Sequence, residues 1–424
     1  MGIPFYFATL AKAHAGIINA VKTRLDVDVF AIDFNCLIHR YLNDDDPIQS
    51  ILNALDHILT NVCHGKKVFI AMDGVVPYGK IVQQRYRRFR EKESGTFDRN
   101  QISPGTPYMK ELEDAICQKF PDIIMSSTTE EGEGEHKIFA WMRTVSYTTS
   151  CIYGLDADLI LLCLAHAEHS LLLRESGEFN LTNSEFATFS SYKLKLCLPI
   201  PLEQYIPLCI LCFGNDFMPN LAVFSLREDG YARALQTYSS AGNPDLRTPE
   251  GRRTFLSAVS ETKVLTERIR MRKQPLERTL IGKDISMMPY KYGLHILDGV
   301  YDMKPIVDAF WKTFHWTVDY FMTNTTNNWA WTYPYADAPL LVDILEHDES
   351  CVPLPSPRMF DVYDQLRFIL PSKSLHSAKK RVVFHDEFHS KTRHPWMKRH
   401  DWEMKPRMSL PWHPTDHLTE VSLL

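Results

Sequence analysis

The sequence predicts an α/β protein, with a mostly parallel central sheet flanked by helices and a smaller helical, aromatic-rich C-terminal region packed on it. Two observations predict this fold. Short apolar runs alternate with helical patterns through the first half of the chain, which is typical of βαβ units. An acidic residue also follows each run, and parallel sheets gather their functional side chains at the carboxyl ends of the strands.

The expected elements of the first half follow one another closely. The apolar runs are Val27–Ile32, Lys67–Met72, Ile123–Ser126, Cys151–Gly154 and Leu208–Phe213. Helical patterns lie at about 46–63, from Tyr78 onward, from about 106 to 120, and at 136–147. The third of these helices has a clear start, because a Pro-Gly break at 103–107 ends in Thr106-Pro107, a typical beginning of a helix.

The character of the chain changes from about Arg247, and we expect a domain boundary near Asn243, between residues 1–243 and 244–424. A charged helical pattern covers Pro249–Arg278, and an aromatic-rich portion follows from about Ile285. The tail from about Lys391 is rich in His, Pro and Arg, and we expect it to be a solvated surface with no metal site.

Composition limits the classes of protein that fit. A chain of 424 residues that is 45% hydrophobic can bury a large core. A formal net charge of −5 argues against a generally basic coat for nucleic acid but is compatible with a local basic patch. Nine cysteines without paired spacing indicate a reducing compartment. With neither a secretory signal nor an apolar run long enough for a membrane span, we expect an intracellular, cytoplasmic protein.

The acids that follow the apolar runs are the strongest functional signal. Any one of them alone would be an ordinary turn residue. If the sheet is parallel, however, all of them meet at one edge, and a cluster of carboxylates requires a cation. The candidate ligands, which we also expect to be the catalytic residues, are Asp33, Asp73, Glu133, Glu135, Asp156, Asp158 and Asp216. Oxygen ligands alone, with no His or Cys at the strand ends, favour Mg²⁺ or Mn²⁺ over Zn²⁺. Seven carboxylates suit two ions about 4 Å apart that clamp a phosphoryl displacement.

A second signal is the basic segment that begins at Tyr78. On a helix, four of its polar side chains share one face: Lys80, Gln84, Arg87 and Arg88. Val82, Tyr86 and Phe89 lie on the opposite face and are expected to pack on the sheet. A solvated charged helix would also explain the pattern. The position just after Asp73 favours a phosphate pocket beside the metals, because two arginines can bind phosphate bidentately.

A third signal is aromatic. Trp329 and Trp331 lie in the segment WAWTYPY, and His39 follows Asp33 by six residues. Aromatic faces beside a metal site can stack the bases of a single strand. The alternative, that these tryptophans belong to the core of the second region, is equally compatible with the sequence.

These segments together resemble the Xrn-type 5′→3′ exoribonucleases. The resemblance rests on MGIPFYFATL, IDFNCLIH, AMDGVVPYGKIVQQRYRRFR, ISPGTPYM, EGEGEHKI, YGLDADLILL and GNDFMP, which keep the family's order over most of residues 1–220. The segment WAWTYPYADAPLL resembles the second conserved region more weakly.

The resemblance implies a PIN/5′-nuclease-like fold and a monomeric hydrolase that degrades single-stranded RNA from a 5′ monophosphate to 5′ mononucleotides. It places the metal ligands on the same seven acids, bound to Mg²⁺. The 5′-monophosphate pocket falls on Lys80, Gln84, Arg87 and Arg88, a base-stacking histidine on His39, and a stacking tryptophan on Trp331, with Trp329 as the other candidate.

The chain also departs from the family. Phe34 and Cys36 stand where the family has Met and Gly, and the second conserved region is abbreviated, which would fit a shortened, viral member. Two alternative functions remain open at this point. One is a structure-selective 5′ nuclease acting on DNA flaps, which would not need the phosphate-reading helix face. The other is an inactive RNA-binding scaffold, against which the intact acid set argues.

Overall fold

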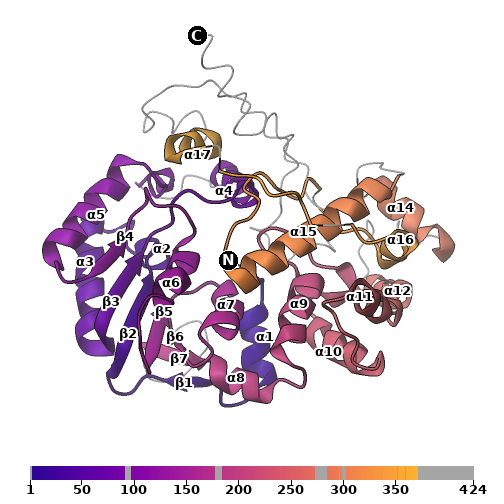
Figure 1. The fold of residues 1–424 in the computed structure, drawn as a ribbon, viewed down its shortest axis with the longest axis horizontal. Coiled ribbons are helices and arrows are strands. Elements are labelled where there is room, and N and C mark those ends of the chain that lie inside the picture. The colour runs from indigo at the N-terminus through magenta and orange to yellow at the C-terminus, as the bar shows by residue number, and fades with distance from the viewer. Residues whose placement is uncertain are drawn as a thin grey trace, which may run out of the picture.

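A computed structural model describes residues 2–90, 97–176, 184–272, 284–295, 297, 302–335, 337–350, 352–358 and 360–370. Its centre is a seven-stranded sheet with the strand order β1-β7-β6-β5-β2-β3-β4 (Figure 1). The strands are β1 (Ile18–Ala20), β2 (Leu25–Asp33), β3 (Cys63–Ala71), β4 (Ile124–Ser126), β5 (Ser150–Tyr153), β6 (Leu171–Glu175) and β7 (Phe186–Ser190). The pairs from β6 to β4 are parallel, whereas β7 and β1 join antiparallel at one edge. The predicted mostly parallel sheet is therefore confirmed.

Helices cover both faces of the sheet. Those of the first part are α1 (Tyr6–Ala13), α2 (Asn35–Ile38), α3 (Pro47–His57), α4 (Tyr78–Arg90), α5 (Pro107–Lys119), α6 (Gly134–Met142), α7 (Asp158–His166), α8 (Ser191–Cys197) and α9 (Leu202–Phe213), with a π-helical turn at Ile58–Val62 and a 3-10 turn, η2, at Arg99–Gln101. Those of the second part are α10 (Gly230–Ser240), α11 (Pro249–Ser257), α12 (Glu261–Arg272), α14 (Met288–His295), α15 (Lys304–Thr323), α16 (Leu341–Glu346) and α17 (Val362–Ile369).

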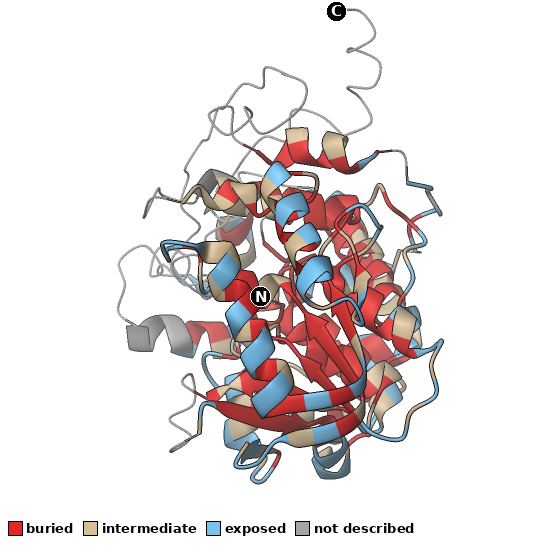
Figure 2. Ribbon diagram, turned by 90° about the vertical axis from the view of Figure 1, so that its left-hand side faces the viewer, coloured by how far each residue is buried: buried red, intermediate tan, exposed pale blue. Residues whose placement is uncertain are grey.

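The alternation of side chains along the central strand β2 divides the core in two. Val29 and Ala31 face the cluster formed with α1, α6, α7 and α9, whereas Phe30 and Ile32 face the cluster formed with α3 and α5. Figure 1 shows α3 and α5 on one side of the sheet and α1 and α7 on the other. Because both faces are covered, β2 is buried from Val29 to Asp33, and the inner parts of the surrounding helices are buried as well (Figure 2).

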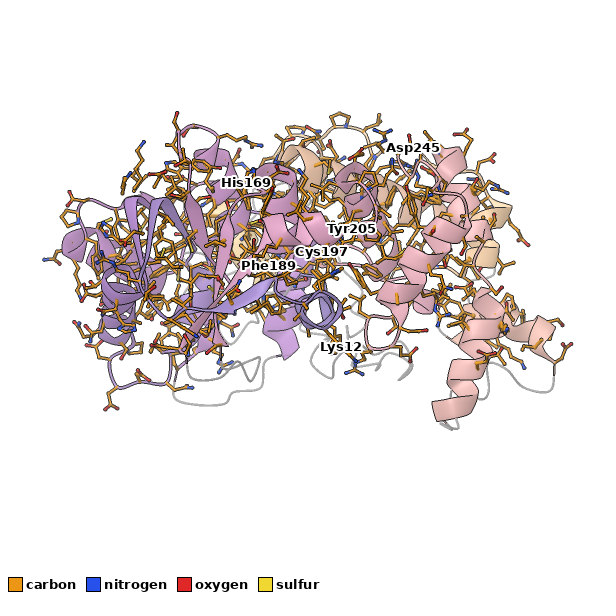
Figure 3. The ribbon with its side chains drawn as sticks, turned by 90° about the horizontal axis from the view of Figure 1, so that it is seen from below. Lys12, His169, Phe189, Cys197, Tyr205 and Asp245 are labelled. Carbon is orange, nitrogen blue, oxygen red and sulfur yellow. The ribbon has the colours of Figure 1, made fainter. Side chains whose placement is uncertain are left out.

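The second, helical part packs on the first. The long helix α15 lies against α7 and α9, and α17 lies against α4. The larger core cluster contains residues from both sides of position 243, such as Leu211 of α9 and Phe310 of α15. In the view of Figure 3, Phe189 of β7 and Tyr205 of α9 lie inside the packed layers, whereas Lys12 of α1 points outward.

Two predicted elements are wrong. Leu208–Phe213 is the end of helix α9 rather than a strand; every residue from Gln204 to Phe213 is buried, and an apolar run without periodicity fits a buried helix as well as a buried strand. The helix expected over Pro249–Arg278 ends at Ser257, where the amides of Ala258 and Val259 bond to carbonyls three residues back, and a new helix begins at Glu261. Strands β1, β6 and β7 were not predicted.

Other sequence expectations have simpler outcomes. The eight described cysteines are free, as expected. Within the described ranges, no single helix has the length and apolarity of a membrane span, although α8 and α9, bent by 95° to each other, pass that test as a pair. The histidine-rich tail lies outside the described residues.

Candidate metal centre and phosphate pocket

Four of the five candidate acid groups reach the site from the carboxyl edge of the sheet. Asp33 is the last residue of β2, and Asp73 follows β3 by two residues. Glu133 and Glu135 begin α6 after β4, and Asp156 and Asp158 lead into α7 after β5. Because β4, β3, β2 and β5 are neighbouring parallel strands, their carboxyl ends meet, and the acids meet with them.

Asp216 arrives by a different route, because α9 and not a strand precedes it. Gly214 ends α9 with a φ of 65°, a conformation that glycine adopts without strain. The side chain of Asn215 then accepts hydrogen bonds from the amides of Phe217 (2.9 Å) and Met218 (3.1 Å), which fixes the turn. Asp216 lies near Asp158 and pairs with Lys80. The strand expected before it was wrong, and its role as a metal ligand stays a prediction.

Backbone contacts hold Asp73 and Glu133 together. The amide of Gly74 donates to the carbonyl of Gly132 (3.0 Å), and the amide of Gly134 donates to the carboxylate of Asp73 (2.8 Å). A side chain at Gly134 would begin 2.9 Å from the carboxylate of Asp33 and 3.1 Å from the carbonyl of Ala71. Glycine therefore allows the start of α6 to approach two of the carboxylates closely.

Mutual repulsion shows that the acids form one electrostatic cluster. Burial, and then the charges of Asp73 and Asp156, raise the pKa of Asp33 well above its usual value. Burial and the neighbouring charge of Asp216 raise the pKa of Asp158 to about 8. The pKa of Glu135 is raised in the same way, by burial and then by the charges of Glu133 and Asp158. Each of these shifts is what a bound cation would oppose.

One lysine already neutralises part of this charge. Lys80 of α4 is buried, and its ammonium pairs with Glu133 and, at 2.8 Å, with Asp216. Burial would lower the pKa of Lys80, but the charges of Asp216 and Glu133 raise it well above its ordinary value. Burial would raise the pKa of Asp216, but the same ammonium helps to bring it below its ordinary value. Lys80 is thus placed at the acid cluster and not only in an anion pocket.

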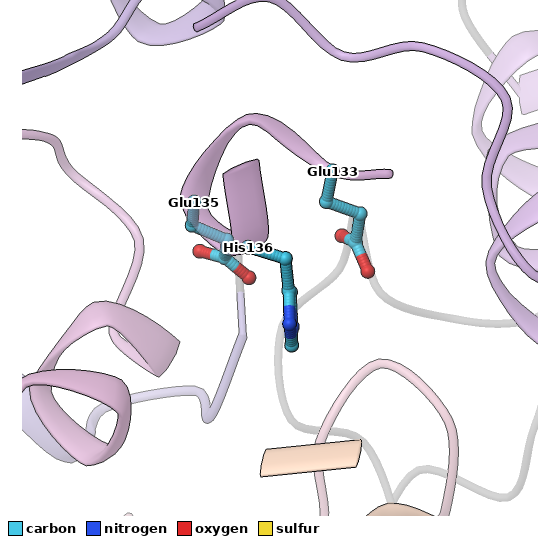
Figure 4. A group of neighbouring side chains, drawn as sticks. All are labelled: Glu133, Glu135 and His136. Carbon is cyan, nitrogen blue, oxygen red and sulfur yellow. The ribbon is translucent and has the colours of Figure 1, made fainter. Parts of the chain in front are cut away.

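The structure adds a histidine that the sequence reasoning missed. One carboxylate oxygen of Glu133, one of Glu135 and a ring nitrogen of His136 lie within 4.8 Å of one another, at the start of α6 (Figure 4). Burial lowers the pKa of His136 to about 3, so its imidazole is neutral. The expectation that only oxygen donors surround the site was therefore incomplete. The dipeptide Glu135-His136 was the available signal, and it was overlooked because only the ends of strands were considered.

These residues fit a divalent cation. Among the described residues, the donor atoms that lie close enough together to share one ion are two carboxylate oxygens, of Glu133 and Glu135, and one neutral imidazole, of His136. Oε2 of Glu135 is buried without a hydrogen-bond partner among those residues. A buried carboxylate oxygen without a donor is costly, and a metal ion would satisfy it.

The predicted phosphate face is on one helix, as expected, but its surroundings differ. Gln84, Arg87 and Arg88 are half-buried on α4, and Gln84 lies 3.5 Å from the side-chain amide of Gln365 on α17. Arg88 donates to the backbone carbonyls of Arg99 (3.2 Å) and Ile102.

The described apolar residues of α4 pack with α17 and not in the two core clusters of the sheet. Val82 belongs to a separate cluster with residues of α17, such as Leu366, and Arg85 donates to the carbonyl of Phe368. The side chains of Tyr86 and Phe89 lie outside the described ones. For Val82 the prediction was wrong, because the partner helix is almost 300 residues away in the sequence. For Tyr86 and Phe89 it stays a prediction.

His39 lies near three arginines of α4 and η2. Burial, and then the charges of Arg87, Arg88 and Arg99, lower the pKa of His39 to about 3, whereas Asp156 opposes the shift. His39 therefore faces both the basic helix and the acid cluster. Arg99, on η2, is a further cation at this place that the sequence reasoning missed.

The two candidate tryptophans have different environments. Trp329 is buried in the cluster around α17 and packs edge-on against Phe360. Trp331 is half-buried, and its indole donates to Thr313 of α15 (3.0 Å). No ring contact joins either tryptophan to His39 within the part of the chain that the structure describes, so the stacking role of Trp331 stays a prediction.

The family described as XRN 5′-3′ exonuclease N-terminus matches residues 1–96 and 91–176. Residues 1–176 are an XRN 5′-3′ exonuclease N-terminal region. This XRN region contains six of the seven candidate metal ligands, the whole of α4 and His39, so the predicted family resemblance is confirmed.

Relatives of the XRN region are similar over a longer stretch. The chain is 31% identical over 316 residues to 5′-3′ exoribonuclease 1 of Saccharomyces cerevisiae, which covers 57% of this chain and 21% of that protein. It is 28% identical over 316 residues to 5′-3′ exoribonuclease 1 of Homo sapiens, covering 56% of this chain and 18% of the relative. The chain thus spans about a fifth of the length of these relatives. Among solved structures, the catalytic core of Rad2 in complex with a DNA substrate has a TM-score of 0.41 at 14% identity, over 77% of this chain and 90% of that one.

Proposed function

We propose that this chain is a 5′→3′ exoribonuclease that hydrolyses single-stranded RNA with a 5′ monophosphate to 5′ mononucleotides, with two Mg²⁺ ions. One observation carries the proposal: Lys80 extends from the basic helix α4 to pair with Glu133 and Asp216. The helix that would bind the terminal phosphate and the carboxylates that would hold the metals are therefore parts of one site.

The residues divide the work between binding and reaction. Arg87 and Arg88 offer guanidinium donors to the 5′ phosphate, with Gln84 beside them, and the adjacent neutral ring of His39 offers a face to the first base. The seven carboxylates would hold the ions, with some of them acting through water. Bound there, the ions would supply positive charge to the attacking water and to the leaving oxygen. Trp331 is proposed as a second stacking surface.

The selectivity proposed here follows from charge and space. A monophosphate end presents about two negative charges to a pocket that contains Arg87, Arg88 and nearby Arg99. A capped or triphosphate end would have to place additional groups between α4 and the acid cluster, where Lys80 is already buried. We expect the enzyme to act as a monomer in the cytoplasm.

A time course on RNA tests the proposal. Equal-length substrates are 5′-phosphorylated RNA, 5′-triphosphate RNA, single-stranded DNA and a DNA flap, each with Mg²⁺ or with a chelator. We expect rapid release of mononucleotides from the first substrate only, and only with the metal. The variant carrying Asp156→Ala and Asp158→Ala should remain folded and lose this activity.

Other outcomes would contradict the proposal in distinct ways. Undiminished hydrolysis by the double variant would exclude the two-metal assignment. Preferential cleavage of the flap would support the structure-selective DNA nuclease instead. Binding of RNA without turnover in Mg²⁺ or Mn²⁺ would support the inactive scaffold.

A further inference from the structure

Helix α15, in the second part of the chain, contacts the acid cluster directly. The hydroxyl of Tyr320, near its C-terminal end, donates to Oε1 of Glu133 at 2.8 Å, and the side chain of Tyr320 is buried. The other oxygen of Glu133 pairs with Lys80. One oxygen of this carboxylate is therefore held by the first part of the chain and the other by the second part. Tyr320 and Glu133 are 187 residues apart in the sequence.

The ring of Tyr320 is itself fixed by its neighbours. Its centroid lies 3.9 Å from that of His136 and 5.0 Å from that of Trp316, which is nearly parallel to it. Phe217 approaches edge-on at 5.3 Å. Since Phe217 adjoins Asp216 and His136 adjoins Glu135, the ring contacts the neighbours of two further candidate ligands.

Helix α15 is anchored on both sides of Tyr320. Asn324, just after α15, donates its side-chain amide to the backbone carbonyl of His136 at 2.9 Å. One turn before Tyr320, the indole of Trp316 donates to the carbonyl of Asn328 at 2.8 Å. The hydroxyl of Tyr320 thus belongs to a rigid frame, and the χ angles that could move it away from Glu133 are restricted by packing.

We propose that Tyr320 is a positioning residue that orients Glu133 for metal binding, and that α15 is the frame that holds it. The proposal rests on the metal role given above to Glu133. Tyr320 acts through Glu133, so it is a positioning residue and not a catalytic one. Partners of metal-binding carboxylates commonly change metal affinity by about 10–100-fold when they are removed.

The test is Tyr320→Phe, which keeps the ring and removes the hydroxyl. Mn²⁺ binding is measured by electron paramagnetic resonance without RNA, so the readout does not depend on nuclease activity. We expect the affinity for Mn²⁺ to fall by about tenfold or more. In hydrolysis assays, the Mg²⁺ concentration for half-maximal rate should rise by a similar factor, whereas kcat at saturating Mg²⁺ should change much less.

Tyr292→Phe is the matched control. Tyr292 is equally buried, and its hydroxyl donates to the backbone carbonyl of Ala338 at 2.8 Å, within a separate apolar cluster. We expect its Mn²⁺ affinity to equal that of the wild type. If Tyr320→Phe does not fold, Trp316→Phe provides a second test, because it keeps the hydroxyl and removes part of the ring's support. Trp316→Phe should also weaken Mn²⁺ binding, but by a smaller factor than Tyr320→Phe.

The outcomes separate the two proposals. If the wild type binds Mn²⁺ and a folded Tyr320→Phe variant binds it equally well, the positioning role is refuted while the metal site stands. The positioning role is also refuted if the control Tyr292→Phe loses as much affinity for Mn²⁺ as Tyr320→Phe. If the wild type binds no Mn²⁺, the metal centre itself is refuted, and the role of Tyr320 with it.

Discussion

Replacing Lys80 with methionine would expose how the acid cluster is neutralised. The ammonium of Lys80 pairs with Glu133 and Asp216, and all three side chains are at most 8% exposed. Removing one partner of a buried ion pair leaves uncompensated charge and costs about 3–5 kcal/mol. We therefore expect Lys80→Met to lose several kcal/mol of stability in a chelator, and its thermal midpoint to fall by several degrees.

Magnesium should reverse much of this loss. An ion at about 100 times its dissociation constant stabilises a protein by about 2.7 kcal/mol. Because the ammonium no longer occupies Glu133 and Asp216, the variant should gain more from Mg²⁺ than the wild type does. Differential scanning calorimetry of both proteins, each with a chelator and with Mg²⁺, measures the two increments.

Lys66→Met is the control for this experiment. Lys66 pairs with Asp28 at 2.7 Å, a similar distance, but its side chain is 78% exposed. Exposed pairs contribute little to stability, so we expect no measurable change. Equal thermal midpoints of Lys80→Met and wild type in the chelator would refute the buried-pair reasoning.

Three further predictions concern α4 and the residues around it. Arg87→Ala and Arg88→Ala should abolish the difference in hydrolysis rate between 5′-monophosphate and 5′-triphosphate RNA, and a preserved ratio of rates would contradict the pocket. Gln365→Leu should lower stability by about 1–3 kcal/mol, because the buried Gln365 side chain accepts from the amide of Val76 (2.9 Å) and donates to the carbonyl of Gly74 (3.1 Å); urea unfolding measures the loss, and an unchanged midpoint would show that α17 does not hold this loop. His39 should stay neutral between pH 5 and 8, because burial and three arginines lower its pKa to about 3. Since this pKa is below the unfolded value of about 6.5, the stability that neutral His39 contributes is complete above pH 6.5 and is lost as the pH falls toward 3. NMR titration of the imidazole in the wild type and in His39→Phe measures this, and an apparent pKa near 6.5 would contradict it.

The sequence predicts features that depend on neighbouring residues, but not contacts between segments that are far apart in the chain. A strand followed by an acid is a local pattern, so Asp33, Asp73 and the two acid pairs could be placed at one sheet edge before the structure was known. The run Leu208–Phe213 could not be assigned, because a short apolar segment has no periodicity that separates a buried helix from a strand.

The candidate site shows the same limit. The helical spacing of Lys80 and Arg88 on α4 follows from a period of 3.6 residues. That Lys80 turns toward Glu133 and Asp216, or that Tyr320 and Gln365 reach the site from more than 180 residues away, depends on how the two parts of the chain pack. No pattern within either part contains that information.

The contact between α4 and α17 also has a consequence for the order of synthesis. Chains fold from the N-terminus as they are translated, so the sheet, its carboxylates and α4 are available once about 216 residues have been made. The partners of α4 on its apolar side, Leu366 and Phe368, are made about 150 residues later. At about 5–20 residues per second, the nascent chain carries the acid cluster for roughly 8–30 seconds before the helix that would read the RNA end can be fixed in place.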